Sequence, residues 1–375
     1  MTGEASRPAV KPTHLISASD LPAIVAGNQL LCSGRGAAGG LDGVTVCVAD
    51  LLERCGPVPL VHLDDLPADA MCAAVGGVGG YASVLELPPG GDEFALAVRA
   101  LEDRTGNRLD AVVALNSAGP NALLPIAAAA ALGLPLVDCD GMGRIFPLIH
   151  QTTYALAGLS TTPLAGVSQT GDTVVLETRS ARADLLLRGI VDASGGFMTC
   201  AMYPATAGQL SEAAIKGSTS RIMRVGELLT TETRHAALLA GLSRTVGARV
   251  LASGQVIALD LPSPSVGARQ YPSVPTSIVV AEPAGGGPVV RLEAQNEILL
   301  ALIDGAVAAA VPDVLCLLDR QKLHPVGLEG IAVGDHVDVL VVPAAPMWHS
   351  AAGLELAGPR AFGFPVRHPN EEGNR

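Results

Sequence analysis

The feature that most constrains the fold is an alternation of short apolar runs with segments of helical periodicity in the first half of the chain. Four runs rich in Val, Leu and Ala are typical of strands buried on both faces. They cover residues 58–63, 71–77, 109–115 and 134–140. Between them, residues 92–106 repeat apolar side chains at helical spacing, and the Ala-rich segment 121–133 ends at Gly133, a typical helix stop. This alternation predicts an α/β fold with a mostly parallel sheet.

The second half of the chain has a different pattern. Residues 173–196 combine a strand with a helix, and residues 206–229 are helical. After Gly247 the apolar runs become short and are separated by turn-forming residues, which is typical of a β-rich domain. We therefore predict an α/β N-terminal domain over residues 14–185 and a mixed, then β-rich C-terminal domain over residues 186–369.

Composition narrows the classes of function. Hydrophobic residues make up 49% of the chain, which excludes a disordered protein. The formal net charge is −12 and the basic residues form no run, so we expect no nucleic-acid partner. No apolar run reaches the ~18 residues of a membrane span, and the first residues lack the apolar core of a signal peptide. We expect a cytoplasmic protein without a membrane partner, and the mean hydropathy of +0.40 favours a homo-oligomer.

The cysteines and histidines form no motif with metal-ligand spacing. The 7 cysteines include no C-x-x-C pair, so we interpret them as reduced thiols, mostly packed in the core, with Cys139 more consistent with packing than with nucleophilic chemistry. The 8 histidines include no H-x-H or H-E-x-x-H pair, and His349 is interpreted as structural. The cofactor therefore stays unknown, with a divalent metal ion possible at a loop that carries carboxylates and amides.

Three polar loops are expected to meet at one edge of the sheet, because ligands of such sheets bind beyond the carboxyl ends of the strands. These loops cover residues 32–43, 115–121 and 138–144. In the first, Gly34, Gly36 and Gly39 approximate a dinucleotide fingerprint, but the segment before them is helical rather than a strand, so no nucleotide is expected. Two interpretations stay open for this loop, a set of backbone donors for an anionic or carbonyl ligand and a plain turn.

The run "DCDGMGR" is the strongest candidate for a functional loop. Asp138 and Asp140 are candidate proton carriers, Gly141 lets the backbone approach a ligand, and Arg144 suits a carboxylate. The alternative is a structural turn in which an aspartate caps a helix that starts near Phe146.

The loop "NSAGPN" offers amide side chains. Asn116 and Asn121 each present a donor and an acceptor, which suits cyclic ureas and imides. Asn121 could instead only cap the helix that follows it. The polar residues 295–297 lie inside an apolar run, so they form either a domain-contact network or a pocket wall.

Several runs together resemble the S-methyl thiohydantoin desulfurase family. The resemblance extends from about Leu21 to Phe364, and "DCDGMGR" and "GPRAFG" are its most specific motifs. The other runs that carry it are "MYPATAG", "IKGSTSRIMRVGELL", "QNEILLA", "VPDVLCLLD" and "VLVVPAAPMWHS". The resemblance implies an α/β N-terminal part and a β-rich C-terminal part.

The resemblance also implies an activity and roles for residues. Water would attack the C–S carbon of a five-membered thiohydantoin ring, releasing a thiol and leaving a hydantoin. Asp138 or Asp140 would handle the proton, which makes them the candidate catalytic residues, while amides and glycine-flanked backbone groups would stabilise developing charge. The candidate substrate-binding residues are Asn116, Asn121, Gly141, Met142 and Arg144.

The chain departs from the family pattern at three places. Arg35 and alanines interrupt the early glycine run, and Asn116 and Leu148 stand where the family carries carboxylates. These losses leave two alternatives beside hydrolysis. One is a diverged member that catalyses ring closure, elimination or isomerisation in a biosynthetic pathway, and the other is a non-catalytic ligand-binding protein.

Overall fold

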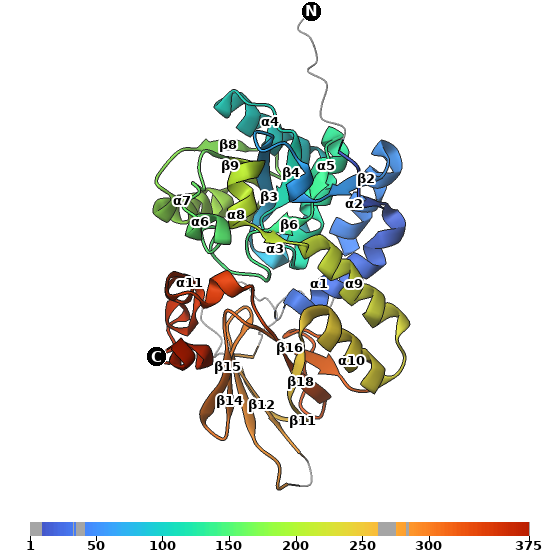
Figure 1. Ribbon diagram of the computed structural model, residues 1–375, viewed down its shortest axis with the longest axis vertical. Coiled ribbons are helices and arrows are strands. Elements are labelled where there is room, and N and C mark those ends of the chain that lie inside the picture. The colour runs from blue at the N-terminus through green and yellow to red at the C-terminus, as the bar shows by residue number, and fades with distance from the viewer. Residues whose placement is uncertain (1–9, 33, 35–41, 262–274, 283–284, 375) are drawn as a thin grey trace, which may run out of the picture. The chain divides into compact units, whose positions relative to one another are not determined.

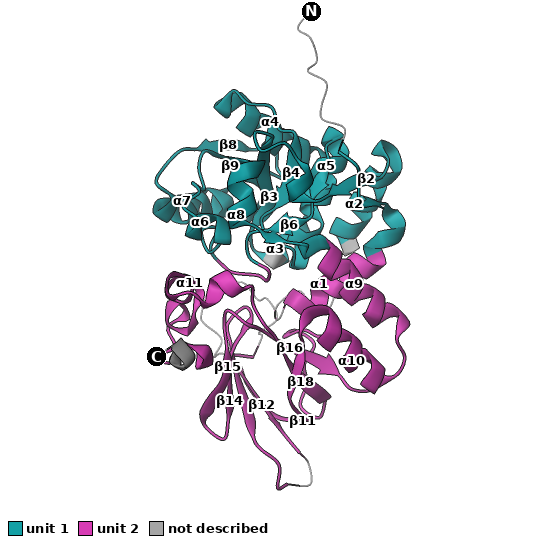
Figure 2. Ribbon diagram, in the orientation of Figure 1, with its two compact units in different colours: residues 1–21, 42–142, 148–219 teal, residues 22–41, 143–147, 220–375 magenta. Residues whose placement is uncertain are grey.

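The chain folds into two compact units, and each combines segments that are far apart in the sequence. The computed structural model describes residues 10–32, 34, 42–261, 275–282 and 285–374. Unit 1 comprises residues 1–21, 42–142 and 148–219, and unit 2 comprises residues 22–41, 143–147 and 220–375 (Figure 2). The domain boundary predicted after residue 185 stays a prediction; residues 186–219 lie in unit 1, and residues 22–41 lie in unit 2.

Unit 1 is built on a mixed eight-stranded sheet with the order β1-β2-β5-β4-β3-β9-β7-β8. Figure 1 labels β2, β3, β4, β8 and β9 of this sheet. The adjacent strands β2, β5, β4 and β3 are parallel, and the remaining pairs are antiparallel. The strands are β1 (His14–Ile16), β2 (Val58–Val61), β3 (Met71–Gly79), β4 (Ala111–Ala114), β5 (Leu136–Val137), β7 (Leu164–Ser168), β8 (Thr173–Leu176) and β9 (Phe197–Thr206). The predicted strands at 58–63, 71–77 and 109–115 are confirmed.

The fourth predicted strand, 134–140, is interrupted at Asp138. β5 ends at Val137, and after Asp138 the chain forms β6 (Cys139–Asp140), which pairs with β10 (Ile215–Lys216) outside the main sheet. The backbone N–H of Asp138 donates to the carbonyl of Val61, while its own carbonyl accepts from the N–H of Gly217. The chain therefore changes sheets at this aspartate.

Helices in unit 1 cover the parallel strands. The predicted helices appear as α4 (Asp92–Thr105) and α5 (Leu124–Leu132), with Gly133 in the left-handed conformation at the end of α5. α5 contacts β3, β4, α4 and α2 (Asp42–Cys55), and its alanines at positions 127–130 are buried. Small side chains on every face allow a helix to pack closely against neighbours on several sides. Unit 1 therefore has the predicted α/β character.

Unit 2 contains a second eight-stranded sheet in which every pair is antiparallel, in the order β15-β14-β13-β12-β11-β18-β16-β17. Its strands are β11 (Arg249–Asp260), β12 (Ser277–Ala281), β13 (Val290–Ala294), β14 (Ile298–Ile303), β15 (Ala306–Ala310), β16 (Val314–Asp319), β17 (Pro325–Val326) and β18 (His336–Val342). Val, Ile and Leu side chains from most of these strands form one buried core. This unit is the predicted β-rich part.

Two helices of unit 2 pack at unusually short distance. α1 (Leu21–Cys32) and α9 (Ser218–Thr231) meet at glycines. A methyl group added at Gly27 would lie 1.9 Å from the carbonyl oxygen of Ile222, and one at Gly226 would lie 1.7 Å from that of Ala23. Only glycine fits at either position, so these residues set the distance between the helices.

The remaining helices are short or lie beside the sheets. They are α3 (Tyr81–Glu86), α6 (Thr153–Leu156), α7 (Ser180–Ala193), α8 (Ala207–Ala213), α10 (His235–Val246) and α11 (Ala351–Ala357). In the part of the chain that the structure describes, no helix has the length and apolar character needed to cross a bilayer.

Candidate functional site

Two of the three predicted loops meet in unit 1. β4 and β5 are neighbouring parallel strands, so the loops that follow them start at the same edge of the sheet. The N–H of Gly141 donates to the carbonyl of Leu115 at 3.2 Å, and the N–H of Ser117 donates to Oδ2 of Asp140 at 2.8 Å. The expected meeting of these two loops is confirmed. In the glycine-rich loop, Gly36 and Gly39 lie outside the described residues.

Asp138, Asp140, Asn116 and Met142 of these loops are buried, and polar contacts hold both loops in shape. Asp138 and Asp140 are 2% and 0% exposed. The amide of Asn116 donates to the sulfur of Met142 at 3.5 Å and accepts from the N–H of Ala118 at 3.1 Å. The arrangement is a packed polar interior that determines the shape of both loops.

Asn121 and the aspartates do not act as helix caps. Leu123 holds the N-cap position of α5, while Oδ1 of Asn121 accepts from the N–H of Gly77 at 2.5 Å. Residues 143–150 contain no helix, and the next helix, α6, is capped by Thr152. The alternatives of a cap at Asn121 and of a helix starting near Phe146 are therefore wrong, because side-chain bonds to distant backbone groups replace local capping.

Cys139, between the two aspartates, is fully buried, as expected. Burial, and then the charges of neighbouring groups, raise the pKa of this thiol well above its ordinary value. The ring of Tyr154 packs in the same interior and donates its hydroxyl to the carbonyl of Ala114 at 3.0 Å. A buried thiol that stays protonated is a poor nucleophile, so Cys139 contributes to packing.

Arg144 belongs to unit 2, where its side chain is 1% exposed. Nη1 donates to the carbonyls of Pro312 and Asp313 at 3.3 and 2.7 Å, and Nε donates to the carbonyl of Ile145 at 3.2 Å. The guanidinium also stacks over the ring of Phe146, 5.2 Å from its centroid. Nη2 has no hydrogen-bond partner among the described residues, which leaves one strong donor open in a buried place.

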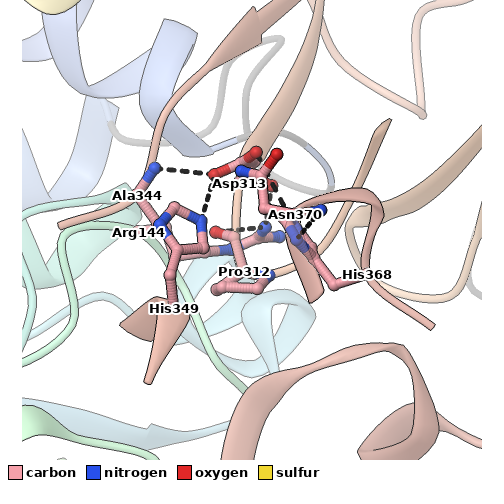
Figure 3. A network of polar contacts seen from close by, with 7 residues as sticks. All are labelled: Arg144, Pro312, Asp313, Ala344, His349, His368 and Asn370. Atoms are coloured by element: carbon pink, nitrogen blue, oxygen red, sulfur yellow. Dashed lines mark hydrogen bonds and ion pairs between the residues drawn. The ribbon is translucent and has the colours of Figure 1, made fainter. Parts of the chain in front are cut away.

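The same network contains a carboxylate between two imidazoles (Figure 3). Nε2 of His349 lies 2.9 Å from Oδ1 of Asp313, and Nε2 of His368 lies 3.5 Å from Oδ2. The N–H of Ala344 donates to Oδ1 at 2.9 Å. Burial by itself would raise the pKa of Asp313, but contacts with the two imidazoles and with this N–H lower it more, so the net pKa lies well below its ordinary value.

The elements that carry the three side chains are far apart in the sequence. Asp313 directly precedes β16, His349 ends the short helix Pro346–His349, and His368 precedes the 3-10 turn Pro369–Asn374. The spacing of histidines gave no sign of this cluster, and the interpretation of His349 as merely structural overlooked it. The only available signal was that Asp313 and His349 both lie in runs that carry the family resemblance.

A cavity of about 520 Å³ in unit 2 borders this network, because His368 lines it. Other lining residues include Leu354, Glu355, Pro359 and Arg360. This volume is in the range of sites for small organic ligands. The "GPRAFG" motif supplies part of the wall.

Two family models match the chain, S-Me-THD-like, N-terminal domain, over residues 19–178 and S-Me-THD-like, C-terminal domain, over residues 178–370. The chain belongs to the S-Me-THD-like family. The resemblance inferred from the sequence motifs is thereby confirmed. Membership in this family accounts for the α/β and β-rich parts, and the family's name suggests an enzyme.

Among solved structures, this S-Me-THD-like protein is similar to a protein from Chromobacterium violaceum whose crystal structure is known. The TM-score is 0.76 at 24% identity, and the match covers 95% of this chain and 99% of that one. At this level of identity the likeness shows a shared fold. None of the curated proteins compared with the chain matches it.

Proposed function

We propose that this protein hydrolyses a small five-membered heterocycle of the S-alkyl thiohydantoin type. Water adds to the ring carbon that carries sulfur, and the C–S bond breaks. One proton of the water ends on the leaving thiol and the other on the ring nitrogen, so that a hydantoin remains. The reaction needs no oxidant or reductant.

The observation that carries this proposal is one buried network that contains an open guanidinium nitrogen and a carboxylate beside two imidazoles. Nη2 of Arg144 is the donor that we assign to the ring carbonyl or to the negative charge that develops during attack. Asp313, His349 and His368 activate the water. Both parts lie in unit 2, and the family match supports a substrate of the thiohydantoin class.

Asp138 and Asp140 were the predicted proton carriers, and their role stays a prediction. We give Asp140 a positioning role instead, because its carboxylate accepts a hydrogen bond from the backbone of the neighbouring loop. The roles of Asn116, Asn121, Gly141 and Met142 as substrate contacts also stay predictions. Arg144 is the one predicted substrate-binding residue that we retain in that role.

The test measures both products. Purified protein is incubated with an S-methyl thiohydantoin, and methanethiol and hydantoin are quantified by mass spectrometry after the protein is removed. Equal amounts of both products are expected. Unchanged substrate and no detectable hydantoin after the incubation would contradict the proposal.

A second candidate function is favoured by Asn116 and Leu148, which stand where carboxylates were expected from the resemblance. A site with fewer carboxylates has fewer groups that can accept a proton from water. A diverged member would then convert the ring without hydrolysis, or would only bind it. Consumption of substrate without thiol would indicate ring chemistry, and retention of unchanged ligand would indicate binding.

A further inference from the structure

The donors of Asp313, His349 and His368 form a compact set within unit 2. One carboxylate oxygen and one nitrogen from each imidazole all lie within 4.8 Å of one another (Figure 3). An ion bound about 2.1 Å from each ligand in a tetrahedral arrangement requires donors about 3.4 Å apart. Nε2 of His349 lies 2.9 Å from Oδ1 of Asp313, and Nε2 of His368 lies 3.5 Å from Oδ2, so each imidazole faces its own carboxylate oxygen at a separation close to that value.

Two further observations favour an ion at this set of donors: the burial of the side chains and a nitrogen without a good hydrogen bond. Asp313 and His368 are 7% and 2% exposed, and His349 is partly buried. Nε2 of His368 faces Oδ2 of Asp313 at 3.5 Å, which is too far for a good hydrogen bond, and no other hydrogen-bond partner is present among the described residues. A buried polar atom without a good hydrogen bond is unfavourable, so an ion that this nitrogen coordinates would be stabilising.

We propose that Asp313, His349 and His368 bind a divalent transition-metal ion of the zinc type. Two imidazole nitrogens and one carboxylate oxygen are a common ligand set for such ions, and they leave a coordination position open for water. The bound ion would lower the pKa of that water and so supply the nucleophile. This catalytic role rests on the proposed function, whereas the binding of the ion does not.

Hydrogen bonds from neighbouring groups hold the metal-binding side chains in position, as is common around metal sites. The N–H of Ala344 donates to Asp313, and Nη1 of Arg144 donates to the carbonyls at 312 and 313, which fixes the turn that carries the carboxylate. Arg144 therefore serves this site through the backbone, while its Nη2 stays available.

Two contacts must change when the ion binds. The first is the hydrogen bond between Nε2 of His349 and Oδ1 of Asp313, which gives way to coordination of the ion by these atoms. The second is a contact of His368. Nδ1 of His368 accepts from the N–H of Asn370 at 3.2 Å, so in the neutral ring the proton resides on Nε2. Coordination through Nε2 transfers this proton to Nδ1 and breaks the contact with Asn370. The loss of these two hydrogen bonds is small beside the free energy of typical structural zinc binding.

The experiment uses the full chain without an affinity tag that contains histidine. The protein is stripped with a chelator, dialysed, and titrated with Zn²⁺ by calorimetry and with Co²⁺ by visible absorption. We expect a single equivalent of Zn²⁺ per chain, and a Co²⁺ spectrum typical of nitrogen and oxygen ligands. His349→Ala and His368→Ala should each weaken Zn²⁺ binding more than tenfold.

His235→Ala is the matched control, because His235 pairs with the buried carboxylate of Asp338 in the same unit and the described residues show no second imidazole beside that carboxylate. This variant should bind Zn²⁺ like the wild type. If an alanine variant fails to fold, as judged by circular dichroism, His349→Gln or His368→Gln replaces it. Absence of Zn²⁺ binding in the folded wild type, or equal binding in wild type and both site variants, would overturn the inference.

Thiol release is measured on the same samples, so that the two proposals fail separately. Zn²⁺ bound at the cluster with no release from a thiohydantoin would refute the proposed function and leave the metal site standing. Full thiol release by the chelator-treated protein, together with a failure to bind added Zn²⁺, would refute the metal site and leave the proposed function standing.

Discussion

The carboxylate of Asp140 accepts a hydrogen bond from the backbone N–H of Ser117, with 2.8 Å between the two atoms. This bond joins the loops that follow two neighbouring parallel strands of unit 1. The carboxylate is fully buried, so water cannot replace the interaction without local opening.

Asp140→Asn should lower the free energy of unfolding by about 1–3 kcal/mol, because a charge-assisted bond is weakened and an amide is placed in a buried position. Urea unfolding measures the change. Asp50→Asn is the control: Asp50 pairs with Arg54 on the surface of α2, where the loss should stay below about 1 kcal/mol. Retained turnover with reduced stability would support the positioning role, whereas abolished turnover at unchanged stability would restore Asp140 as a proton carrier.

Gly141→Ala should destabilise the protein by about 1–3 kcal/mol through overpacking. The added methyl group would lie 2.7 Å from two ring carbons of Tyr154, whose buried hydroxyl is held by the carbonyl of Ala114. Gly189→Ala is the matched control in α7, where nothing lies within 4 Å of the added carbon. That change should raise stability by about 0.5–1 kcal/mol, since alanine is the better helix former. Thermal and urea unfolding of both variants check the prediction, and equal effects would contradict it.

Arg144→Lys should lower both stability and substrate turnover. A lysine cannot keep two backbone carbonyls satisfied, stack over Phe146 and present a further donor at once. We expect a loss of about 2–3 kcal/mol in unfolding free energy and a fall in kcat/KM of at least tenfold. Arg54→Lys on the surface should change neither quantity. Normal kcat/KM in the folded Arg144 variant would exclude the assigned contact with substrate.

The thiols should react in an order set by burial. Cys55 is exposed and should be alkylated first in the native protein. Burial, and then nearby acidic groups, raise the pKa of Cys47 to about 11, so at pH 8 only about a thousandth of it is thiolate. Burial raises the pKa of Cys72, Cys200 and Cys316 to about 12, and these should react only on unfolding.

Raising the pH toward 11 should therefore speed modification of Cys47, because a larger fraction loses its proton. Peptide mass spectrometry after timed alkylation follows each position. Cys55→Ser removes the fast phase and provides the control. Rapid labelling of Cys200 in folded protein would contradict the burial of the central strand β9.

Much of the candidate loop geometry in unit 1 follows from local sequence patterns. Apolar runs identified β2, β3 and β4, and Gly133 marked the end of α5. Since parallel neighbours place their following loops at one edge, the meeting of residues 115–118 with residues 138–142 could be predicted. The pattern could not predict that the chain leaves the main sheet at Asp138, because the partner strand β10 lies far along the sequence.

The sequence by itself determined most of the predicted strands and helices and, through its motifs, the family, because periodicity and turn chemistry depend on residues within a few positions of each other. It did not reveal the short strand β10, which interrupts the predicted helical segment 206–229. Only the tertiary structure decided that Asp313, His349 and His368 meet, and that Arg144 uses backbone carbonyls while one nitrogen stays open. Asp313 and His349 lie 36 residues apart in the sequence, and no local periodicity connects them. Their meeting depends on how the segments around β16 and β18 and the C-terminal turns pack in unit 2, which is a property of the whole fold.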